Sequence, residues 1–318
     1  MPVTNQSVFD SASELFHTLA DDVFADGVPG QWSTFADLSP TSAKTNTLNV
    51  LEAFPVVREW TGAKKYDDVH AAGLSLTVKQ WEASFSIKRI DYVGDTSGQL
   101  GKRIGMWLNG ASRFYDKIAT DVLVSSSGAG PTGYDGVALY SASHPRGPAG
   151  ATQSNLTASA LSFSVHDAVL QAMASIRDAK GEPIGAMPNV MMCGPKNQKL
   201  AKEITQSTER VLPVSAAGIE AYSSAVAATT VPNVFGGGEM MLVINPRLVG
   251  SYDDYVYYFD TTKGAPAIAG FEMRSVEAHE QTSMDSERRF ERDEFAFSLE
   301  ADVIFGAGAW QTSHALIT

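Results

Sequence analysis

Three glycines in the stretch Gly128–Pro145, GAGPTGYDGVALYSASHP, have the spacing of a dinucleotide-binding fingerprint. Such a fingerprint binds its cofactor only where it follows a strand and begins a helix, because the helix N-terminus holds the pyrophosphate. Here Gly128, Gly130 and Gly133 follow a helical pattern, enclose a proline and precede a strand-like segment. Turn formation explains all three glycines, so we predict no nucleotide site.

The other residue types that could support catalysis or metal binding each lack the partners that such chemistry needs. The stretch GDTSGQLGKR resembles a phosphate loop, but Arg103 stands where Ser or Thr must bind magnesium. His279 has no second histidine one helical turn later, and Cys193 lies in an apolar strand pattern. His144 precedes a proline and is typical of a turn residue bonded to a backbone carbonyl. We therefore predict no catalytic, cofactor-binding or metal-ligating residues, no cofactor and no enzyme activity.

Composition narrows the function classes further. The chain has 318 residues, enough for one or two domains, and a formal net charge of −12, which argues against a basic face that grips nucleic acid. Its single cysteine excludes an intrachain disulfide and fits a reducing compartment. No window approaches the roughly 18 consecutive apolar residues of a membrane span. We expect a protein without a membrane partner.

Elements that could position functional residues begin with an N-terminal helix, which we expect to start at a capping box of Ser11 and Glu14. One face of this helix is apolar, formed by Leu15, Phe16, Leu19 and Val23. The following segment 26–55 is rich in Gly, Pro, Ser and Thr, and about 30 residues without periodicity are rare inside a compact domain. A free linker does not need large apolar residues, so we predict an arm that lies on another surface. The apolar residues that we take as its anchors are Trp32, Phe35, Leu38 and Leu51.

Two runs with alternating apolar residues, GLSLTVKQ and WEASFSIKRIDY, predict a β-hairpin that turns near Lys79–Gln80. A two-stranded hairpin is marginal in water, so its apolar face needs a partner. A long apolar stripe then predicts one helix over 97–124, roughly 40 Å long, with its cap at Thr96–Ser97.

The second half of the sequence predicts a mixed α/β part. A helix is expected to begin at a capping pair, Ser164 and Asp167. PNVMMCG and EMMLVIN predict two buried strands, with a helix over Pro195–Ile204 between them and loop between that helix and the second strand. The remaining sequence to the C-terminus is β-rich, so the fold class is α+β.

The order of these parts resembles the Hong Kong 97-type shell fold of tailed-phage major capsid proteins, and more narrowly the Mu-like major head subunit family. The residues that carry the resemblance span roughly 55–315 and contain no catalytic signature. They are REWTGAKKYDDV, WEASFSIKRIDYVGD, YDGVALYSASHP, IRDAKGEPIGAMPNVMMCGP and RRFERDEFAFSLEADVIFGAGAWQTS.

The resemblance implies a self-assembling icosahedral shell around double-stranded DNA. It implies an N-terminal helix and arm (1–56), an extended loop (57–93), a spine helix with peripheral domain (94–185), an axial domain (186–255) and a return to the peripheral domain (256–318). Expected partners are the chain itself in pentamers and hexamers, portal and scaffolding proteins, a decoration protein, and packaged DNA contacted weakly. The expected location is the virion capsid, after assembly in the host cytoplasm.

An arm and a hairpin without a core of their own are expected to contact neighbouring subunits, and arginine forks suit carboxylates at such interfaces. The predicted intersubunit contact residues are Trp32, Phe35, Trp60, Lys64, Lys65, Trp81, Arg89, Arg288, Arg289 and Arg292. Two alternatives remain open at this point. A tail-tube or other virion subunit shares the acidic, β-rich profile but lacks a long helix, and a nucleotide-dependent enzyme is the other alternative.

Overall fold

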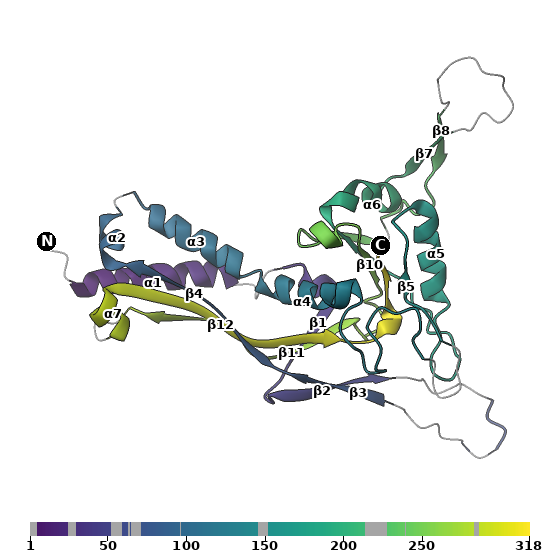
Figure 1. Cartoon of the computed structure of the whole chain (residues 1–318), viewed down its shortest axis with the longest axis horizontal. Helices are drawn as coiled ribbons and strands as arrows, with labels where there is room; N and C mark the ends of the chain where they lie inside the picture. The colour runs from purple at the N-terminus through teal and green to yellow at the C-terminus, as the bar shows by residue number, and fades with distance from the viewer. Residues whose placement is uncertain are drawn as a thin grey trace. The chain divides into compact units, whose positions relative to one another are not determined.

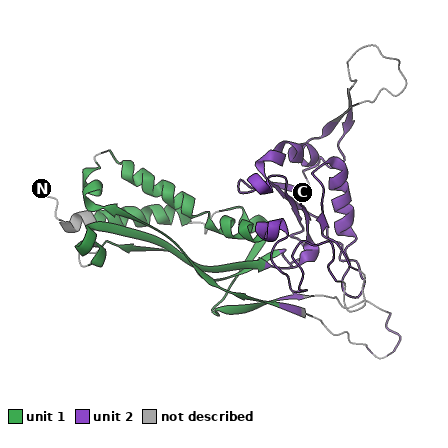
Figure 2. Ribbon diagram, in the orientation of Figure 1, with its two compact units in different colours: residues 1–48, 74–122, 268–306 green, residues 49–73, 123–267, 307–318 purple. Residues whose placement is uncertain are grey.

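The computed structural model describes most of the chain and divides it into two compact units (Figure 2). Unit 1 comprises residues 1–48, 74–122 and 268–306, and unit 2 comprises 49–73, 123–267 and 307–318. The described residues are 5–24, 30–51, 59–62, 64, 71–95, 97–145, 152–213, 228–238, 240–282 and 286–318.

Unit 1 is built on a four-stranded sheet in the order β1-β11-β12-β4. Its strands are β1 (Ala36–Pro40), β4 (Lys79–Lys88), β11 (Ile268–Gln281) and β12 (Glu294–Ala307). β1 runs parallel to β11, whereas β12 and β4 are antiparallel, from the pair Glu294 and Lys88 to the pair Val303 and Lys79. Residues alternate between buried and partly exposed along the first half of β12, as expected for a sheet with one covered face.

Helices cover the apolar face of this sheet (Figure 1). Phe16, Ile104 and Leu108 are buried against Phe295 and Phe297 of β12, and the rings of Phe16 and Phe297 lie 4.6 Å apart. The helices of this unit are α1 (Asn5–Phe24), α2 (Arg89–Gly94), α3 (Gln99–Ala111), most of α4 (Phe114–Val124) and α7 (Glu287–Arg292). The apolar face predicted for the N-terminal helix is confirmed. Its predicted start is wrong, because α1 already begins at Asn5 and Ser11 lies inside it.

The single long helix predicted over 97–124 is interrupted between α3 and α4. The hydroxyl of the buried Ser112 donates to the carbonyl of Asn109 at 3.0 Å, so the side chain competes with the helical hydrogen-bond pattern at this point. The predicted capping role of Ser97 is wrong, because the N-cap residue of α3 is Gly98, and Thr96 lies outside the described residues. The carboxylate of Asp95 accepts the backbone N–H groups of Ser97, Gln99 and Leu100, and these hydrogen bonds, chiefly the one from Leu100, lower the pKa of Asp95.

The two predicted strands of the extended loop exist, but they do not pair with each other. β3 (Ala71–Thr77) pairs with β2 (Thr45–Leu51), whereas β4 pairs with β12. The buried Val78 separates β3 from β4, and its N–H donates to the carbonyl of Lys44 at 2.8 Å, so the chain passes from one sheet to the other without a hairpin turn. Alternation identifies a strand but not its partner, which here lies more than 200 positions away along the chain.

The segment predicted as an arm that lies on another surface is partly integrated into unit 1 of its own chain. η1 (Trp32–Thr34) precedes β1, and the Trp32 ring packs against Tyr115 and Phe305 at 5.6 and 5.9 Å. Phe35 is 2% exposed. The expectation that this stretch lacks a partner in its own chain is therefore wrong for residues 32–40.

Unit 2 contains a five-stranded mixed sheet in the order β5-β13-β10-β6-β9. Its strands are β5 (Leu156–Thr157), β6 (Val190–Cys193), β9 (Met241–Ile244), β10 (Val256–Phe259) and β13 (Ser313–Leu316). Every residue of β6, β10 and β13 is buried, as expected for central strands covered on both faces. The two buried strands and the intervening helix predicted from the sequence are confirmed as β6, β9 and α6 (Gln198–Thr205).

Two features of unit 2 differ from the sequence expectation. The helix α5 (Phe163–Ala174) is capped by Ser162, whose hydroxyl accepts the N–H of Val165 at 3.2 Å, and not by Ser164. The region after α6, predicted as loop, contains the antiparallel pair β7 (Glu209–Pro213) and β8 (Ala228–Pro232). The remaining short helices are η2 (Ser125–Gly128), η3 (Pro195–Asn197), η4 (Gly250–Tyr252) and η5 (Trp310–Thr312).

Candidate functional site

The glycine-rich stretch forms a packed turn in unit 2. Gly128 and Gly130 have φ of +88° and +75°, a left-handed conformation that favours glycine. A Cβ atom on Gly128 would overlap the ring of Tyr255, and one on Gly130 would lie 2.8 Å from Cβ of Leu139. Turn geometry and close packing thus account for these glycines, as the sequence predicted.

The motif YDGVALYSASHP contributes a buried polar cluster rather than a turn histidine. The ring nitrogens of His144 lie 2.6 Å from Oδ2 of Asp135 and 3.1 Å from Oδ1 of Asn155, and the ring stacks on Trp310 at 4.1 Å. The amide of Asn155 donates to the carbonyls of Leu139 and Trp310. The expected bond from the His144 ring to a backbone carbonyl is therefore wrong. The cluster joins segments from 135 to 155 to the C-terminal part of the chain, which is a structural role.

The remaining candidates for chemistry do not come together. Cys193 is buried in β6, and burial raises the pKa of its thiol to about 12, so it behaves as a small apolar side chain. Among the described residues, no group of three or more His, Cys, Asp or Glu side chains could hold a metal ion. No helix in the described part is long and apolar enough to cross a membrane.

The predicted contact residues near the N-terminus, in β4 and at the start of α2 make contacts within their own chain. Trp32 and Phe35 belong to unit 1, and the indole of Trp81 donates to the carbonyl of Val303 at 3.0 Å. Nε of Arg89 lies 3.0 Å from both carboxylate oxygens of Asp293. The side chain of Phe35 is 2% exposed and offers almost no area to a neighbour.

The predicted contact residues of the extended loop that the structure describes, Trp60 and Lys64, are exposed. Trp60 is 75% exposed, and Nζ of Lys64 lies 5.5 Å from the centroid of its ring. The Trp60 indole donates locally to the carbonyl of Gly62. Lys65 lies outside the described residues.

The arginine candidates belong to α7 and its surroundings. Arg288 lies 3.9 Å from Glu294 of its own chain, Arg292 is exposed, and the side chain of Arg289 is outside the described part. These arginines adjoin an apolar surface that the sequence analysis missed. We define the α2–α7 patch as the exposed apolar residues of two short helices of unit 1: Ile90 (70% exposed) and Val93 (51%) of α2, and Phe290 (93%) of α7. The start of α2 lies beside the end of α7, because the N–H of Arg89 donates to the carbonyl of Asp293 at 2.9 Å.

The only sequence signal for the α2–α7 patch was Phe290, a single aromatic residue inside the charged run ERRFER. The helices that carry the patch have six residues each, too short for an apolar periodicity. An aromatic side chain as exposed as Phe290 is a candidate for an interaction surface.

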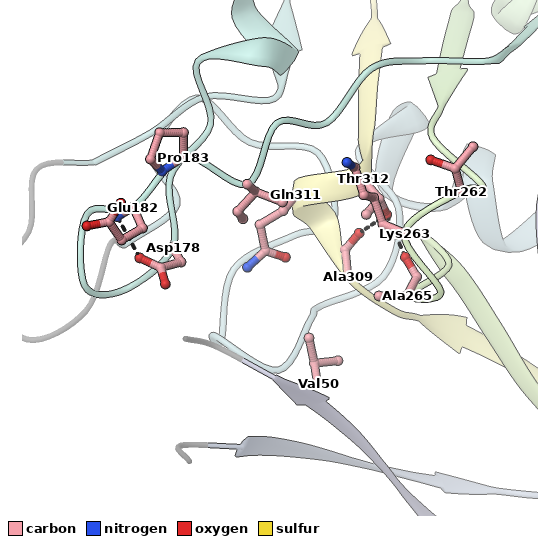
Figure 3. Close-up of a pocket in the computed structure, with 11 residues that line it drawn as sticks. Val50, Asp178, Glu182, Pro183, Thr262, Lys263, Ala265, Ala309, Gln311 and Thr312 are labelled. Carbon is pink, nitrogen blue, oxygen red and sulfur yellow. Dashed lines mark hydrogen bonds between the residues drawn. The ribbon is translucent and has the colours of Figure 1, made fainter. Parts of the chain in front are cut away.

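Unit 2 also contains a pocket of about 530 Å³, within the range of ordinary ligand sites (Figure 3). Its walls are mostly apolar, with Val50, Ile184 and Ala309 among them. Gln311 is 7% exposed, and its Nε2 donates to the Tyr134 hydroxyl at 2.6 Å, whereas its buried Oε1 accepts no hydrogen bond. No pattern in the sequence predicted this pocket, because its walls come from four separate segments of the chain.

The two-unit α+β architecture is that of the Hong Kong 97-type shell fold, as comparison with solved structures shows. A chain from the procapsid of bacteriophage JBD30 matches with a TM-score of 0.56 and 19% identity, over 97% of this chain and 74% of that chain. A chain of Microbacterium phage Oxtober96 matches with a TM-score of 0.53 and 15% identity, over 90% of both chains. A family model described as phage capsid protein matches residues 72–312, and the chain belongs to that family.

Two curated relatives match over shorter stretches. The major capsid protein of Escherichia phage Mu is 31% identical over 70 residues, which are 22% of this chain and 23% of the relative. The Mu-like prophage FluMu major head subunit of Haemophilus influenzae is 26% identical over 127 residues, 39% of this chain and 41% of the relative. The matched stretches thus span less than half the length of these relatives.

Proposed function

We propose that this protein is a major capsid protein that assembles into the icosahedral shell enclosing phage double-stranded DNA. The observation that carries the proposal is the family match over residues 72–312, which favours a capsid subunit over the tail-tube alternative. The role is structural rather than catalytic, in keeping with the family. The proposal locates the protein in the virion capsid, after assembly in the host cytoplasm.

The surfaces of the chain support a role in assembly. Phe290 is 93% exposed in an otherwise charged helix, and burial of an exposed aromatic side chain against a neighbour is favourable. Glu287, Arg288, Glu291 and Arg292 place both signs of charge around it, so two copies of this surface are complementary to each other. In the proposed shell the α2–α7 patch and the exposed Trp60 segment are contact surfaces between subunits.

In the proposed capsid protein, the chain is divided into arm, extended loop, spine helix, peripheral domain and axial domain. Its proposed partners are further copies in pentamers and hexamers, portal and scaffolding proteins, a decoration protein and packaged DNA. The net charge of −12 supports weak rather than tight contact with DNA, since affinity for DNA grows with each phosphate that a basic residue neutralises.

Electron microscopy and analytical ultracentrifugation of the purified protein test the proposal. The expected result is closed shells at high protein concentration. A concentrated sample that stays entirely single chains, with or without the family's accessory proteins, would overturn it.

A substitution in the α2–α7 patch tests the contact surface itself. Phe290→Asp places a charge where the proposal buries a ring, so we expect shells to be lost while the free subunit keeps its unfolding temperature. Val234→Asp is the matched control, because Val234 is similarly exposed (84%) but lies in unit 2. Normal shells from the Phe290→Asp protein would remove the patch from the proposed contacts.

A further inference from the structure

The pocket of unit 2 combines three properties that together specify an occupant. Its walls are largely apolar, and its buried Gln311 Oε1 lacks a hydrogen-bond donor. A buried acceptor without a partner is costly, so an occupant that supplies one N–H group is favoured over a purely apolar one. Its rim carries opposite charges on two sides, with Glu182 beside Asp178 on one and Lys263 on the other (Figure 3).

Tryptophan is the side chain that fits the apolar walls and the acceptor at once. The indole is a large apolar ring with a single N–H group that donates and cannot accept. Trp60 is exposed in its own chain, where its N–H donates to the carbonyl of Gly62 at the surface. Moving this N–H to a buried acceptor exchanges an exposed hydrogen bond for one shielded from water.

The charges beside Trp60 match those at the pocket rim. Glu59 precedes the ring and Lys64 lies over it, so the exposed segment carries an acid and a base around its aromatic residue. The rim carries a base, Lys263, and an acid, Glu182, around Gln311. When the indole is in the pocket, Lys64 forms an ion pair with Glu182, and Glu59 forms one with Lys263.

We propose that the pocket receives Trp60 from a second copy of this chain, with the indole N–H donating to Gln311 Oε1. The inference rests on the proposed self-assembly and assigns it one specific intersubunit contact. Trp60 of the same chain does not fill the pocket, because the residue is 75% exposed.

Disulfide trapping tests which chain supplies the ring. One protein carries Thr61→Cys, which keeps Trp60, and the other carries Glu182→Cys at the rim; the native Cys193 is buried in both. Oxidation of mixed assemblies is expected to link the two different chains. The control pairs Thr61→Cys with Val234→Cys, which is exposed but does not line the pocket, and should give no product.

The double variant Thr61→Cys/Glu182→Cys distinguishes Trp60 of a second copy from Trp60 of the same chain as the occupant of the pocket. The proposal predicts chains linked in series. A disulfide confined to single chains would overturn it by showing that the loop folds back on its own pocket. Shells without any cross-link would overturn the inference while leaving the proposed function intact, whereas absence of shells from the unmodified protein would remove both.

A double-mutant cycle tests the hydrogen bond itself. Trp60→Phe keeps a ring but removes the N–H, and Gln311→Leu removes the acceptor. Each is expected to raise the protein concentration needed for assembly by roughly fivefold, the effect of about one hydrogen bond. The double variant should need no higher protein concentration for assembly than either single variant, since both single variants already lack the same hydrogen bond. Thermal unfolding of the free subunits checks that the variants fold, and effects that simply multiply would contradict the proposal.

Discussion

The sheets of the two units differ in what covers them. In unit 2 all four residues of β10 are buried, and strands pair with it on both sides. In unit 1 the inward residues of β12 are covered by α1 and α3, whereas Arg274, Glu300 and Asp302 form an ion-pair network on the sheet, with Nε of Arg274 3.1 Å from Asp302. The central strands of the unit 2 sheet are thus enclosed on both faces, whereas β12 of unit 1 is covered by helices on one face and carries ion pairs on the other.

The largest expected effect comes from the core of unit 2. Phe259→Ala removes a side chain that is 1% exposed and should lower the free energy of unfolding by about 3–5 kcal/mol. Ser298→Ala in β12 of unit 1 is a control at a partly exposed position of the other sheet, with an expected change within about 0.5 kcal/mol. Denaturant titrations of both variants measure the difference. Equal losses would contradict the contrast between the sheets.

As the pH falls, unit 2 should lose stability before unit 1 does. His166 and His314 are buried in unit 2, and burial lowers the pKa of each to about 4. The unfolded chain binds protons at these residues near pH 6.5 and the folded chain does not, so stability is present above pH 6.5 and falls as the pH drops toward 4. The loss is of the order of 3 kcal/mol per histidine at pH 4.

Thermal unfolding between pH 7 and pH 4.5 measures this acid sensitivity, and hydrogen exchange locates it. His166→Gln should flatten the pH dependence, and His17→Gln, at a partly exposed position of unit 1, is the matched control. An identical pH dependence in the His166→Gln and unmodified proteins would show that burial of this imidazole does not govern acid stability.

The smallest of these effects is expected at the start of α3 in unit 1. Asp95→Ala removes the acceptor for three backbone N–H groups and should lower the unfolding temperature by a few degrees, because caps contribute modestly to helix stability. Asp95→Asn keeps a side-chain oxygen and should retain most of the effect. The lowered pKa of Asp95 means that its contribution disappears as the pH falls through the acid range. Faster hydrogen exchange confined to the first turn of α3 is the measurement that separates a cap from a general loss of stability.

Local patterns in the sequence predict many of the helices and strands, but they do not predict which distant strands pair. The apolar runs of β6 and β9 and the helical stripe of α1 depend on neighbouring residues, so they were predictable. The pairing of β4 with β12 joins Lys79 to Val303, and no local pattern specifies such a partner. The same limit explains the hairpin that was predicted and not found.

The candidate contact surfaces were predictable only in part, for a related reason. Trp60 is a predicted contact of the extended loop, and it is exposed. Trp32 is a predicted anchor of the arm on another surface, yet Tyr115 and Phe305 of its own chain lie beside it in the fold. The pocket around Gln311 is formed by segments that meet only after folding, so composition and residue spacing could not predict it.

The buried amide of Asn155 has a consequence for producing the protein. Asn155, Leu156 and Thr157 form an acceptor sequence for N-linked glycans, and the side chain is fully enclosed with both amide hydrogens bonded to carbonyls. A sugar attached there during passage through a eukaryotic secretory pathway would occupy the position of those bonds before the chain could close around them. Secreted expression should therefore give misfolded glycoprotein, and expression in bacteria or in the cytosol avoids the modification.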